Sequence, residues 1–436
     1  MTSWTGLDSL PQSGAALLVA NSAPAALETA VRQQRPALQL LGNRVFTLDR
    51  RESLLSALHG GSDVPVIPCH VDASEIRAGK PVGRGKLHEI GAAADRLAYL
   101  EWRIAVLSRR TSIKQDTAKP LARPRLDAGL PEPVAPAVPP GQLALEVDAL
   151  RPDGLLASSG GLEVFLASPA RIPGVLREIG RLREIAFRAA GEGSGQALDL
   201  DRFDDDYLHL FVWNPVKREI AGAYRLSSNG VGAGRLYTAT LFHYGAEFLE
   251  RTGPALELGR SFIRLEYQRG FAPLLLLWKG IGRYVSGHPE YKILFGPVSI
   301  SNQYSALSRE LMIAFLERRE WLAGLASLVR ARRPPTGRPA AEHCRDLDDL
   351  SDVVSDLEPG ARGVPILLRQ YLRLGGKLLG FNVDPDFSNS LDGLILVDLT
   401  RTDPRLLDRY FGAASAAQFL SYWKGNHGNF KDSQIR

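Results

Sequence analysis

The chain has 436 residues, of which 44% are hydrophobic and 23% charged, a composition typical of folded globular domains. At about 150 residues per domain, this length predicts two or three domains. The net charge of +5 is too small to indicate nucleic-acid binding, although it is compatible with an acidic partner or an anionic membrane surface. Cys69 and Cys344 are the only cysteines, which excludes a disulfide framework and a cysteine-rich metal site and fits a reducing cytoplasm.

The sequence shows no segment that predicts export or a membrane span. No basic stretch precedes an apolar core near the N-terminus, so we predict no signal peptide. The longest apolar run, Leu274–Trp278, is far shorter than the roughly 20 residues that a membrane-spanning helix needs. We therefore expect a cytoplasmic protein that at most binds peripherally to the inner face of the cytoplasmic membrane.

Residues 1–114 alternate short apolar strands with helices, which predicts a small α/β domain. The expected strands are 15–20, 38–41 and 64–68, and the expected helices are 25–32 and a segment that starts near 86 and continues through 94–109. Residues 115–145 follow, with seven prolines and few aromatic side chains. Such a stretch buries too little apolar area to order itself, so we predict a semi-rigid linker there.

Residues 146–436 predict a second, larger α/β domain. Its first helix, 172–189, has an apolar stripe at helical spacing, and strands 207–213 and 220–226 flank the turn of a hairpin. An exposed basic loop is expected at Arg330–Pro339. Strand pairs mixed with helices indicate an α/β sandwich with a mixed sheet. Further strands are expected at 162–167, 256–263, 291–298, 377–383 and 393–399, and further helices at 272–286, 305–319 and 364–374.

Ordered segments between about 155 and 425 carry a family resemblance. They are RLREIAFRAAGEGSG, DLDRFDDDYLHLFVWN, REIAGAYRL, LELGRSFIRLEYQRGFAPLLLLWKGIGRYV, LFGPVSISNQYSALSREL and GVPILLRQYLRLGGKLLGFNVDPDF. Together they resemble the hemolysin-like N-acyltransferases of GNAT fold, a family that includes ornithine-lipid and N-acyl amino acid synthases. The resemblance implies a GNAT-like mixed sheet and transfer of an acyl chain from a thioester to an amine.

A second resemblance concerns the N-terminal domain. The segment VANSAPAALE resembles the HxxxxD-type stretch of glycerolipid acyltransferases, with Ser22 where the His would stand and Glu28 where the Asp would stand. Ser22 has no nitrogen that accepts a proton near neutral pH, so the general base is missing. The resemblance implies a degenerate remnant of that domain, and the alternative is an unrelated small α/β cap.

Glu257 is the predicted catalytic carboxylate. It lies mid-strand between Leu256 and Leu258, where a charged side chain is costly unless it is used. The GNAT resemblance implies that strands 256–263 and 291–298 diverge beside it. Diverging strands leave backbone groups that the pantetheine amides of an acyl donor can pair with.

Arg260 is the second predicted catalytic residue. In a regular strand Glu257 and Arg260 point to opposite faces, but Gly259 between them permits a bulge that would re-aim one of them. The resemblance implies such a bulge near the thioester carbonyl, and the structural alternative is a Glu257–Arg260 ion pair. Tyr304, in SISNQYS, resembles the GNAT tyrosine that protonates the departing thiolate, although a packing role is equally compatible with its position.

Alternating acids and guanidinium groups form a further candidate cluster. Asp201, Asp204 and Arg225 match acidic and basic positions that the resembling families place beside the Glu, and they are predicted to bind substrate together with Arg260. One arginine could clamp the carboxylate of an amino acid. We expect solvent-exposed positions for the remaining charged residues of this region, which are Asp199, Asp205, Asp206, Arg183 and Arg188.

The acyl donor is expected at the start of helix 272–286, because helix N-termini attract phosphate. Gln268, Arg269 and Gly270 stand where CoA-using GNAT enzymes carry a Q/R-x-x-G-x-G/A loop, but with fewer glycines. This departure favours acyl carrier protein over CoA as donor. Lys279 and Arg283 share one helix face and could meet an acidic carrier protein, and the alternative is an ordinary basic surface.

No pair of His or Cys residues has metal-ligand spacing, so no metal is predicted, and no cofactor beyond the acyl-thioester substrate is expected. These features together favour N-acylation of an amino acid by a fatty or 3-hydroxyacyl chain, giving a lipoamino acid of the ornithine or glycine type. The alternatives are a lysophospholipid O-acyltransferase, an acyl-homoserine lactone synthase, and a catalytically silent protein that binds acyl carrier protein or lipid.

Overall fold

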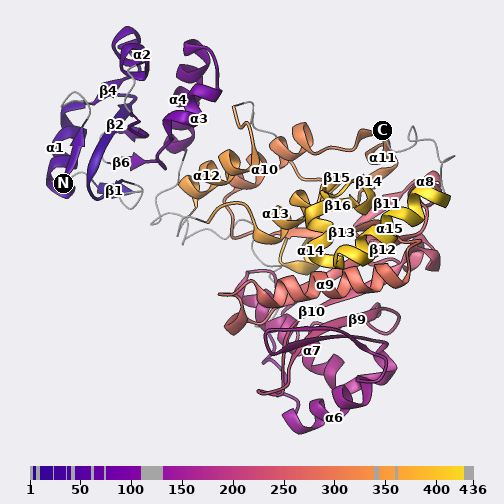
Figure 1. Ribbon diagram of the computed structural model, residues 1–436. Helices are drawn as coiled ribbons and strands as arrows, with labels where there is room; N and C mark the ends of the chain where they lie inside the picture. Colours follow the sequence, from indigo (N-terminus) through magenta and orange to yellow (C-terminus); the bar gives the residue numbers. More distant parts are fainter. Residues whose placement is uncertain are drawn as a thin grey trace. The chain divides into compact units, whose positions relative to one another are not determined.

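The computed structural model describes residues 3–5, 10–22, 24–35, 37–40, 45–59, 63–72, 75–109, 131–337, 343–358 and 362–426. The chain forms two compact units (Figure 1). The first unit comprises Met1–Ala122, Ser305–Phe315 and Pro339–Pro365. The second unit comprises Arg123–Tyr304, Leu316–Arg338 and Ile366–Arg436.

The first unit is built on a mostly parallel sheet with the strand order β1-β6-β5-β2-β3, to which β4 adds by pairing with β2. Parallel strands need helical crossovers, which explains the alternation seen in the sequence. Its strands are β1 (Ser3–Thr5), β2 (Gly14–Ala20), β3 (Leu38–Leu40), β4 (Phe46–Thr47), β5 (Val66–Val71) and β6 (Glu75–Ala78). Its helices include α1 (Pro24–Gln34), α2 (Arg51–His59), α3 (Arg84–Glu89), α4 (Ala93–Ser108), most of α10 (Ala306–Arg319) and α12 (Leu347–Leu357).

Helix α12 joins the first unit although it lies more than 200 residues after α4 in the chain. The Arg103 guanidinium on α4 is buried and donates to Asp356 on α12 and to the Tyr99 hydroxyl, which in turn donates to Asp349. The Lys80 amide also donates to Asp356, at 2.7 Å. A buried guanidinium needs such partners. The first unit therefore includes α12, a segment that we expected to belong to the C-terminal domain.

The second unit contains the mixed α/β sheet that the sequence predicts. Its eight strands have the order β15-β16-β13-β12-β10-β9-β8-β7. In chain order they are β7 (Leu155–Ser159), β8 (Leu162–Ala167), β9 (Leu208–Asn214), β10 (Glu219–Ser228), β12 (Ala255–Ile263), β13 (Ile293–Ile300), β15 (Lys377–Asp384) and β16 (Ser390–Asp398). The parallel pair β12–β13 lies among antiparallel pairs, so the expectation of a GNAT-like mixed sheet is confirmed.

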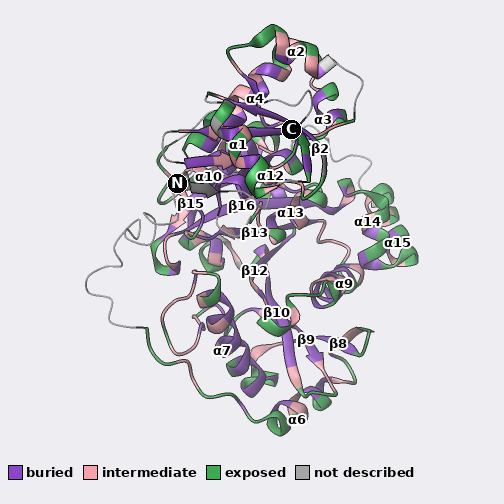
Figure 2. Ribbon diagram, turned by 90° about the vertical axis from the view of Figure 1, so that its left-hand side faces the viewer, coloured by how far each residue is buried: buried purple, intermediate pink, exposed green. Residues whose placement is uncertain are grey.

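Helices cover both faces of this sheet. Figure 2 shows α7 (Pro173–Ala189) on one side of β9, β10 and β12 and α9 (Ala272–Gly287) on the other, and contacts of α7 with β12 and of α9 with β7 to β10 agree. We call these the α7 face and the α9 face. The smaller elements are α6 (Pro140–Leu150), α8 (Glu247–Thr252), α11 (Ala323–Ala326), α13 (Ile366–Arg373), α14 (Pro404–Phe411), α15 (Ala413–Asn426) and the strand pair β11 (Phe242–Tyr244) and β14 (Val329–Ala331).

The predicted linker 115–145 differs from expectation in its second half. Residues 115–130 lie outside the described residues, but 131–145 run along the second unit and enter α6. Val138 and Leu143 are buried in the core beneath α7, and the Val138 amide donates to Glu178 at 3.0 Å. The buried Val138 and Leu143 side chains anchor this segment to the core, and the prediction of a linker, which rested on the proline content, did not take them into account.

The expected basic loop at 330–339 is also partly ordered by the fold. Arg330 lies in β14, and the Arg333 amide donates to the Asn382 side chain at 2.7 Å. Residues 338 and 339 lie outside the described part of the chain. None of the helices that the structure describes is long and apolar enough to cross a membrane.

Candidate functional site

The strands β12 and β13 separate after a short paired segment. Only Ala255, Leu256 and Glu257 pair with β13, opposite Ile293–Phe295. Beyond this point β12 continues along β10 as far as Ile263, whereas β13 continues along β16 as far as Ile300. The predicted divergence of these two strands is therefore confirmed, and it begins directly after Glu257.

Glycine at position 296 marks the start of the divergence. A Cβ there would lie far inside van der Waals contact with the Leu258 carbonyl oxygen, so only glycine fits without movement. The two backbones thus remain in close contact for one more residue before they part. This contact fixes where the gap between the strands begins.

Arg260 forms a bulge in β12. Ala223 pairs with Phe262 and Arg225 with Gly259, so two residues of β12 face one residue of β10. Arg260 has a φ of 48°, the left-handed region that a non-glycine residue rarely adopts. The bulge turns the Arg260 side chain to the α7 face, where Glu257 also lies. The bulge expected near Gly259 is confirmed.

Glu257 is buried, with 1% of its surface exposed, and its carboxylate is fully engaged. It accepts hydrogen bonds from the Tyr237 amide at 3.0 Å, the Thr238 amide at 2.7 Å and the Tyr207 hydroxyl. These contacts hold the short helical turn Tyr237–Thr240 against the sheet. The alternative of a Glu257–Arg260 ion pair is wrong, because Arg260 pairs with other carboxylates.

Asp201, Asp204 and Arg225 form the charge cluster that the sequence predicts. The Arg225 guanidinium donates to both oxygens of Asp201, at 2.7 and 3.0 Å, and lies 3.1 Å from Asp204. Burial opposes ionisation of Asp204, but Arg183 and Arg225 hold its pKa below the usual value. Burial and the nearby Arg183 lower the pKa of His209 to about 4, so this histidine is neutral near pH 7.

The exposed positions expected for Asp199 and Arg183 are wrong. Arg183 is fully buried and donates to Asp204 at 2.7 Å, because the face of α7 that carries it packs on the sheet. Asp199 is also buried and lies 3.6 Å from the Arg260 Nε atom. Arg188 is partly buried and donates to Glu184 at 2.7 Å. Asp205 and Asp206 are exposed as expected.

The Arg260 guanidinium is held by charge and by aromatic rings rather than by hydrogen bonds. It lies 3.5 Å from Asp201, 5.0 Å from the Tyr237 ring centroid and 4.7 Å from that of Phe387. Among the residues that the structure describes, its side chain makes no hydrogen bond, and its Nε atom is buried without a partner. Its N–H groups therefore lack a hydrogen-bonded acceptor among the described residues, and its nearest carboxylates, Asp199 and Asp201, lie 3.6 and 3.5 Å away.

Three carboxylates that the sequence analysis missed surround this guanidinium. Glu192 follows α7, Asp384 ends β15 and Asp392 lies in β16, and all three are buried and interact electrostatically with Arg260. Burial raises the pKa of Glu192 to about 7 and also raises the pKa of Asp384. Burial, with Asp384 and Glu192 nearby, raises the pKa of Asp392. The expected strands 377–383 and 393–399 stop one residue short of Asp384 and Asp392, and Glu192 lies in the loop after α7, so no sequence signal pointed to these acids.

The predicted donor-binding residues lie beyond the end of β12. Gln268, Arg269 and Gly270 are exposed in the connection to α9, and the Gln268 side chain donates to the Ile263 carbonyl at 2.8 Å. Phe271, which precedes α9, is 71% exposed. On α9 itself Arg283 is exposed and Lys279 half-buried. Tyr304 is buried in the turn after β13, and its role stays a prediction.

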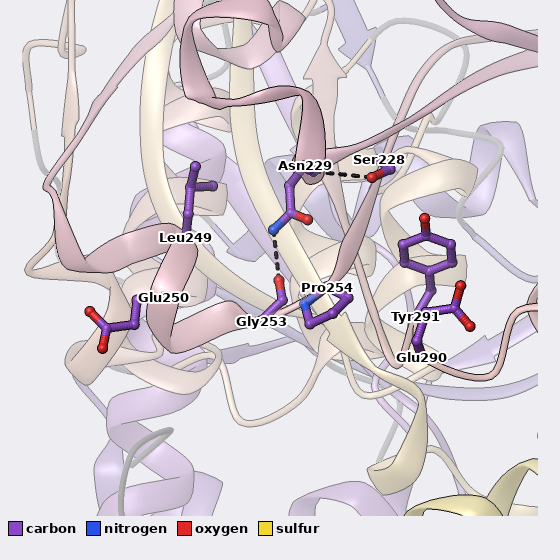
Figure 3. Close-up of a pocket in the computed structure, with 9 residues that line it drawn as sticks. Ser228, Asn229, Leu249, Glu250, Gly253, Pro254, Glu290 and Tyr291 are labelled. Atoms are coloured by element: carbon purple, nitrogen blue, oxygen red, sulfur yellow. Dashed lines mark hydrogen bonds between the residues drawn. The ribbon is translucent and has the colours of Figure 1, made fainter.

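A separate cavity of about 540 Å³ lies where β10 ends and β12 begins (Figure 3). The Asn229 side chain donates to the Gly253 carbonyl at 2.7 Å on one side of it. This cavity is at the opposite end of β12 from Arg260, and no predicted site residue lines it. Its lining residues are Ser228, Asn229, Gly230, Leu249, Glu250, Gly253, Pro254, Glu290 and Tyr291.

No group of three or more His, Cys, Asp or Glu side chains in the described part of the chain could hold a metal ion. The three carboxylates around Arg260 therefore do not converge as metal ligands do.

Comparison with known proteins agrees with this geometry. Residues 182–279 match the family described as acetyltransferase (GNAT) domain. A glycine N(alpha)-acyltransferase of Bacteroides thetaiotaomicron is 31% identical over 271 residues, which cover 56% of this chain and 80% of that protein. An L-ornithine N(alpha)-acyltransferase of Rhodobacter capsulatus is 32% identical over 253 residues, covering 54% of this chain and 89% of that protein. The chain belongs to this GNAT-domain N-acyltransferase family.

A third relative supports the assignment. A glycine N(alpha)-acyltransferase of Phocaeicola vulgatus is 38% identical over 172 residues, which cover 36% of this N-acyltransferase and 53% of the relative. The protein is thus an acyltransferase that moves an acyl group to an amine. The match at 182–279 includes the charge cluster, Glu257 and Arg260, whereas Asp384 and Asp392 lie beyond it.

Proposed function

We propose that this N-acyltransferase moves a fatty or 3-hydroxyacyl chain from acyl carrier protein to the α-amine of an amino acid, giving a lipoamino acid. The names of the relatives, which refer to glycine and to L-ornithine, support an amino acid acceptor. The observation that carries the proposal is the divergence of β12 and β13 beside a guanidinium whose donors are unused.

The reaction needs a thioester, a neutral amine and a place where both meet. The diverging strands leave the inner edge of β12 after Glu257 without a strand partner, so the amides of a pantetheine arm can pair there. The thioester carbonyl then lies near the bulge. Arg260 is placed to bind a carboxylate or the developing oxyanion, and the low dielectric around it strengthens that interaction.

Direct attack of the amine in a ternary complex is the chemistry that the residues support. Both cysteines are buried, and burial raises the pKa of the Cys69 thiol well above its usual value, which disfavours a thiolate nucleophile. No other activated nucleophile lies among the described residues around Arg260. A covalent acyl-enzyme is therefore not part of the proposal.

An acyl carrier protein fits the donor side better than CoA does. The connection between β12 and α9 has few glycines to wrap a pyrophosphate, while a carrier-bound arm has one phosphate. Exposed Arg269 and Arg283 offer positive charge to an acidic carrier protein. Peripheral membrane contact is part of the same proposal, through exposed Arg330, Arg332 and Arg333.

The N-terminal unit gives no support to the alternative of lysophospholipid O-acylation. Ser22 is exposed directly after β2, at the position where the general base would stand. The Glu28 carboxylate accepts a hydrogen bond from the Val45 amide at 2.8 Å, which is a structural contact. The reading of this unit as a degenerate acyltransferase remnant stays a hypothesis.

Purified protein supplied with acyl carrier protein thioesters or acyl-CoA, and with glycine or ornithine, tests the proposal. We expect an N-acyl amino acid by mass spectrometry, faster with the carrier-protein donor. We expect Arg260→Gln to lower kcat/KM by at least about 100-fold. Arg264→Gln, which removes a partly exposed arginine paired with Glu219 at 2.7 Å, is the matched control.

Three outcomes contradict different parts of the proposal. No N-acyl product with any amino acid overturns the amino acid acceptor. Equal or faster turnover with acyl-CoA overturns the carrier-protein donor. An active Arg260→Gln protein overturns the site.

A further inference from the structure

The register of the sheet brings two of the three carboxylates around Arg260, Asp384 and Asp392, to one face. Ser299 in β13 is directly opposite Asp392 in β16, which is directly opposite Asn382 in β15. Side chains that pair across strands lie on the same face, and Asp384 shares that face because it follows Asn382 by two residues. A polar row thus crosses three strands on the far side of the gap from β12.

Glu192 reaches this row from the end of α7. The Ser299 hydroxyl donates to the Glu192 carboxylate at 3.0 Å, so Glu192 lies over the strand next to Asp392. The groups that face Glu192 are Ser299 on β13, Arg260 on β12 and Asp392 on β16. Apart from Ser299, no residue that the structure describes donates a hydrogen bond to its side chain.

Asp392 has the most unusual environment of the three acids. Only 4% of its surface is exposed, yet within the described ranges its side chain makes no hydrogen bond and no ion pair shorter than 4 Å. Asp384, in contrast, accepts from the Asp386 amide at 3.0 Å and from the Tyr237 hydroxyl at 3.4 Å. Burial without a donor makes ionisation of this carboxylate costly, and a ligand ammonium at this position would supply the missing donor.

Arg260 supplies the opposite charge on the other side of the gap. Its guanidinium has unused donors, as described above, and it interacts electrostatically with Glu192 and Asp392. An acid row facing a guanidinium matches a molecule that carries an ammonium and a carboxylate on one carbon. Asp392 on one side of the gap and Arg260 on the other both lack a hydrogen-bond partner among the described residues, and one zwitterion would supply both.

We propose that Asp392, Glu192 and Arg260 form the acceptor site for an α-amino acid zwitterion, in which Asp392 and Glu192 bind the ammonium, Arg260 binds the carboxylate, and Glu192 is the general base. This inference rests on the proposed function, because it names the residues that receive its acceptor. It also assigns the proton transfer to Glu192, because the Glu257 oxygens are already occupied by Tyr207 and two backbone amides.

The proposed chemistry balances as follows. The ammonium gives one proton to the Glu192 carboxylate and becomes a neutral amine. Its nitrogen then attacks the thioester carbonyl carbon, so that a C–N bond forms and the carbonyl electron pair moves to oxygen. When the carbonyl re-forms, the C–S bond breaks and its electron pair leaves with sulfur. The nitrogen loses a second proton, which ends on the sulfur, and Glu192 releases the first proton to solvent.

Calorimetric titration of the purified full-length protein with glycine and with L-ornithine tests binding apart from turnover. We expect Asp392→Asn to weaken binding of the amino acid by about tenfold or more, because a charge-assisted contact to a buried group is lost. Glycolate, which lacks the ammonium, should bind weakly to both proteins. Unchanged amino acid affinity in Asp392→Asn, or no amino acid binding by the wild-type protein, overturns the inference.

Kinetics of Glu192→Gln test the general base. We expect kcat to fall by about 100-fold or more, with the KM of the acyl donor within about twofold of wild type. Because the base acts only when ionised, wild-type kcat/KM should rise with pH to a plateau above about 7, and the variant should lose this rise. Glu250→Gln, in the separate cavity of Figure 3, is the control and should behave as wild type.

The two proposals fail in different ways. If wild-type protein binds amino acids but forms no N-acyl product, the proposed function fails while the site stands. If product forms but Glu192→Gln keeps both its kcat and its pH profile, the inference fails while the proposed function stands. Should Asp392→Asn not fold, Ser299→Ala tests the same row, because it removes the hydroxyl that holds Glu192.

Discussion

At the scale of single residues, the site contains two kinds of buried carboxylate, which differ in the number of hydrogen bonds they accept. Glu257 accepts three hydrogen bonds and holds the turn at Tyr237, whereas Asp392 accepts none within the described chain. A carboxylate whose oxygens already accept hydrogen bonds stabilises the fold, and a carboxylate that accepts none is available to a ligand. Both residues are acids within strands, so their positions in the sequence do not distinguish a structural role from a ligand-binding role, whereas their hydrogen-bond partners do.

Replacing Glu257 should show its structural role. We expect Glu257→Ala to lower the free energy of unfolding by about 3 kcal/mol, because the amides of Tyr237 and Thr238 are left buried without an acceptor. Glu257→Gln keeps an acceptor oxygen and should cost less. Chemical denaturation measures both. A stable Glu257→Gln protein that has lost both kcat and the pH dependence would instead restore Glu257 as the base.

Glu192 should make the protein less stable at alkaline pH. Burial raises its pKa from 4.5 to about 7, so ionisation is less favourable in the folded than in the unfolded protein. The favourable contribution of the protonated form is complete below pH 4.5 and is lost as the pH rises through about 7. At pH 8 the free energy of unfolding of Glu192→Gln should therefore exceed that of wild type, by at most about 3 kcal/mol. At pH 4.5 the two free energies of unfolding should differ little. Chemical denaturation at both pH values measures the difference. Equal stability at pH 8 would contradict this.

At the scale of elements, the parting of β12 and β13 depends on a close contact followed by a bulge. We expect Gly296→Ala to destabilise the protein by about 2 kcal/mol and to raise the KM of the acyl donor, because the new Cβ pushes against the Leu258 carbonyl. Gly287→Ala is the control, since a Cβ there meets no atom within 4 Å. Thermal unfolding and donor titration check both variants, and an unaffected donor KM would contradict the expectation.

The sequence predicts the elements better than it predicts the site. The hairpin of β9 and β10, the helix α7 and the strands β12 and β13 are found within three residues of their expected ends, because periodicity and turns are local signals. The burial of Arg183 and Asp199 was not predicted, since it depends on which helix face meets the sheet. Glu192 and Asp392 are 200 residues apart, and only the register of β13 and β16 brings them together.

At the scale of the whole molecule, the first unit depends on two segments that come late in the chain. Leu350, Val353 and Val354 of α12 are fully buried within it, as are the Asp349 and Asp356 carboxylates. Removing the N-terminal residues would leave this helix without the partners that bury it. The protein therefore cannot be cut into a self-contained second half at the proline-rich stretch.

A shortened chain beginning at residue 131 should show this dependence. We expect it to aggregate or to unfold at a lower temperature than the full chain, because α12 would expose its apolar side chains and two acids that lose Arg103 and Tyr99. Size-exclusion chromatography and thermal unfolding measure the effect. A monomeric shortened chain with full-length stability would contradict the expectation.

The bulge in β12 is one extra residue, and this residue decides which face of the sheet carries the Arg260 side chain. If Ser261 were deleted, β12 and β10 would match one to one, and Phe262 would keep its place in the core beneath α7. Only Arg260 would change sides, toward α9 and away from the acids. We expect this shortened strand to fold, because Phe262 keeps its place in the core, and the protein to lose acyl transfer, because Arg260 would face away from the diverging strands.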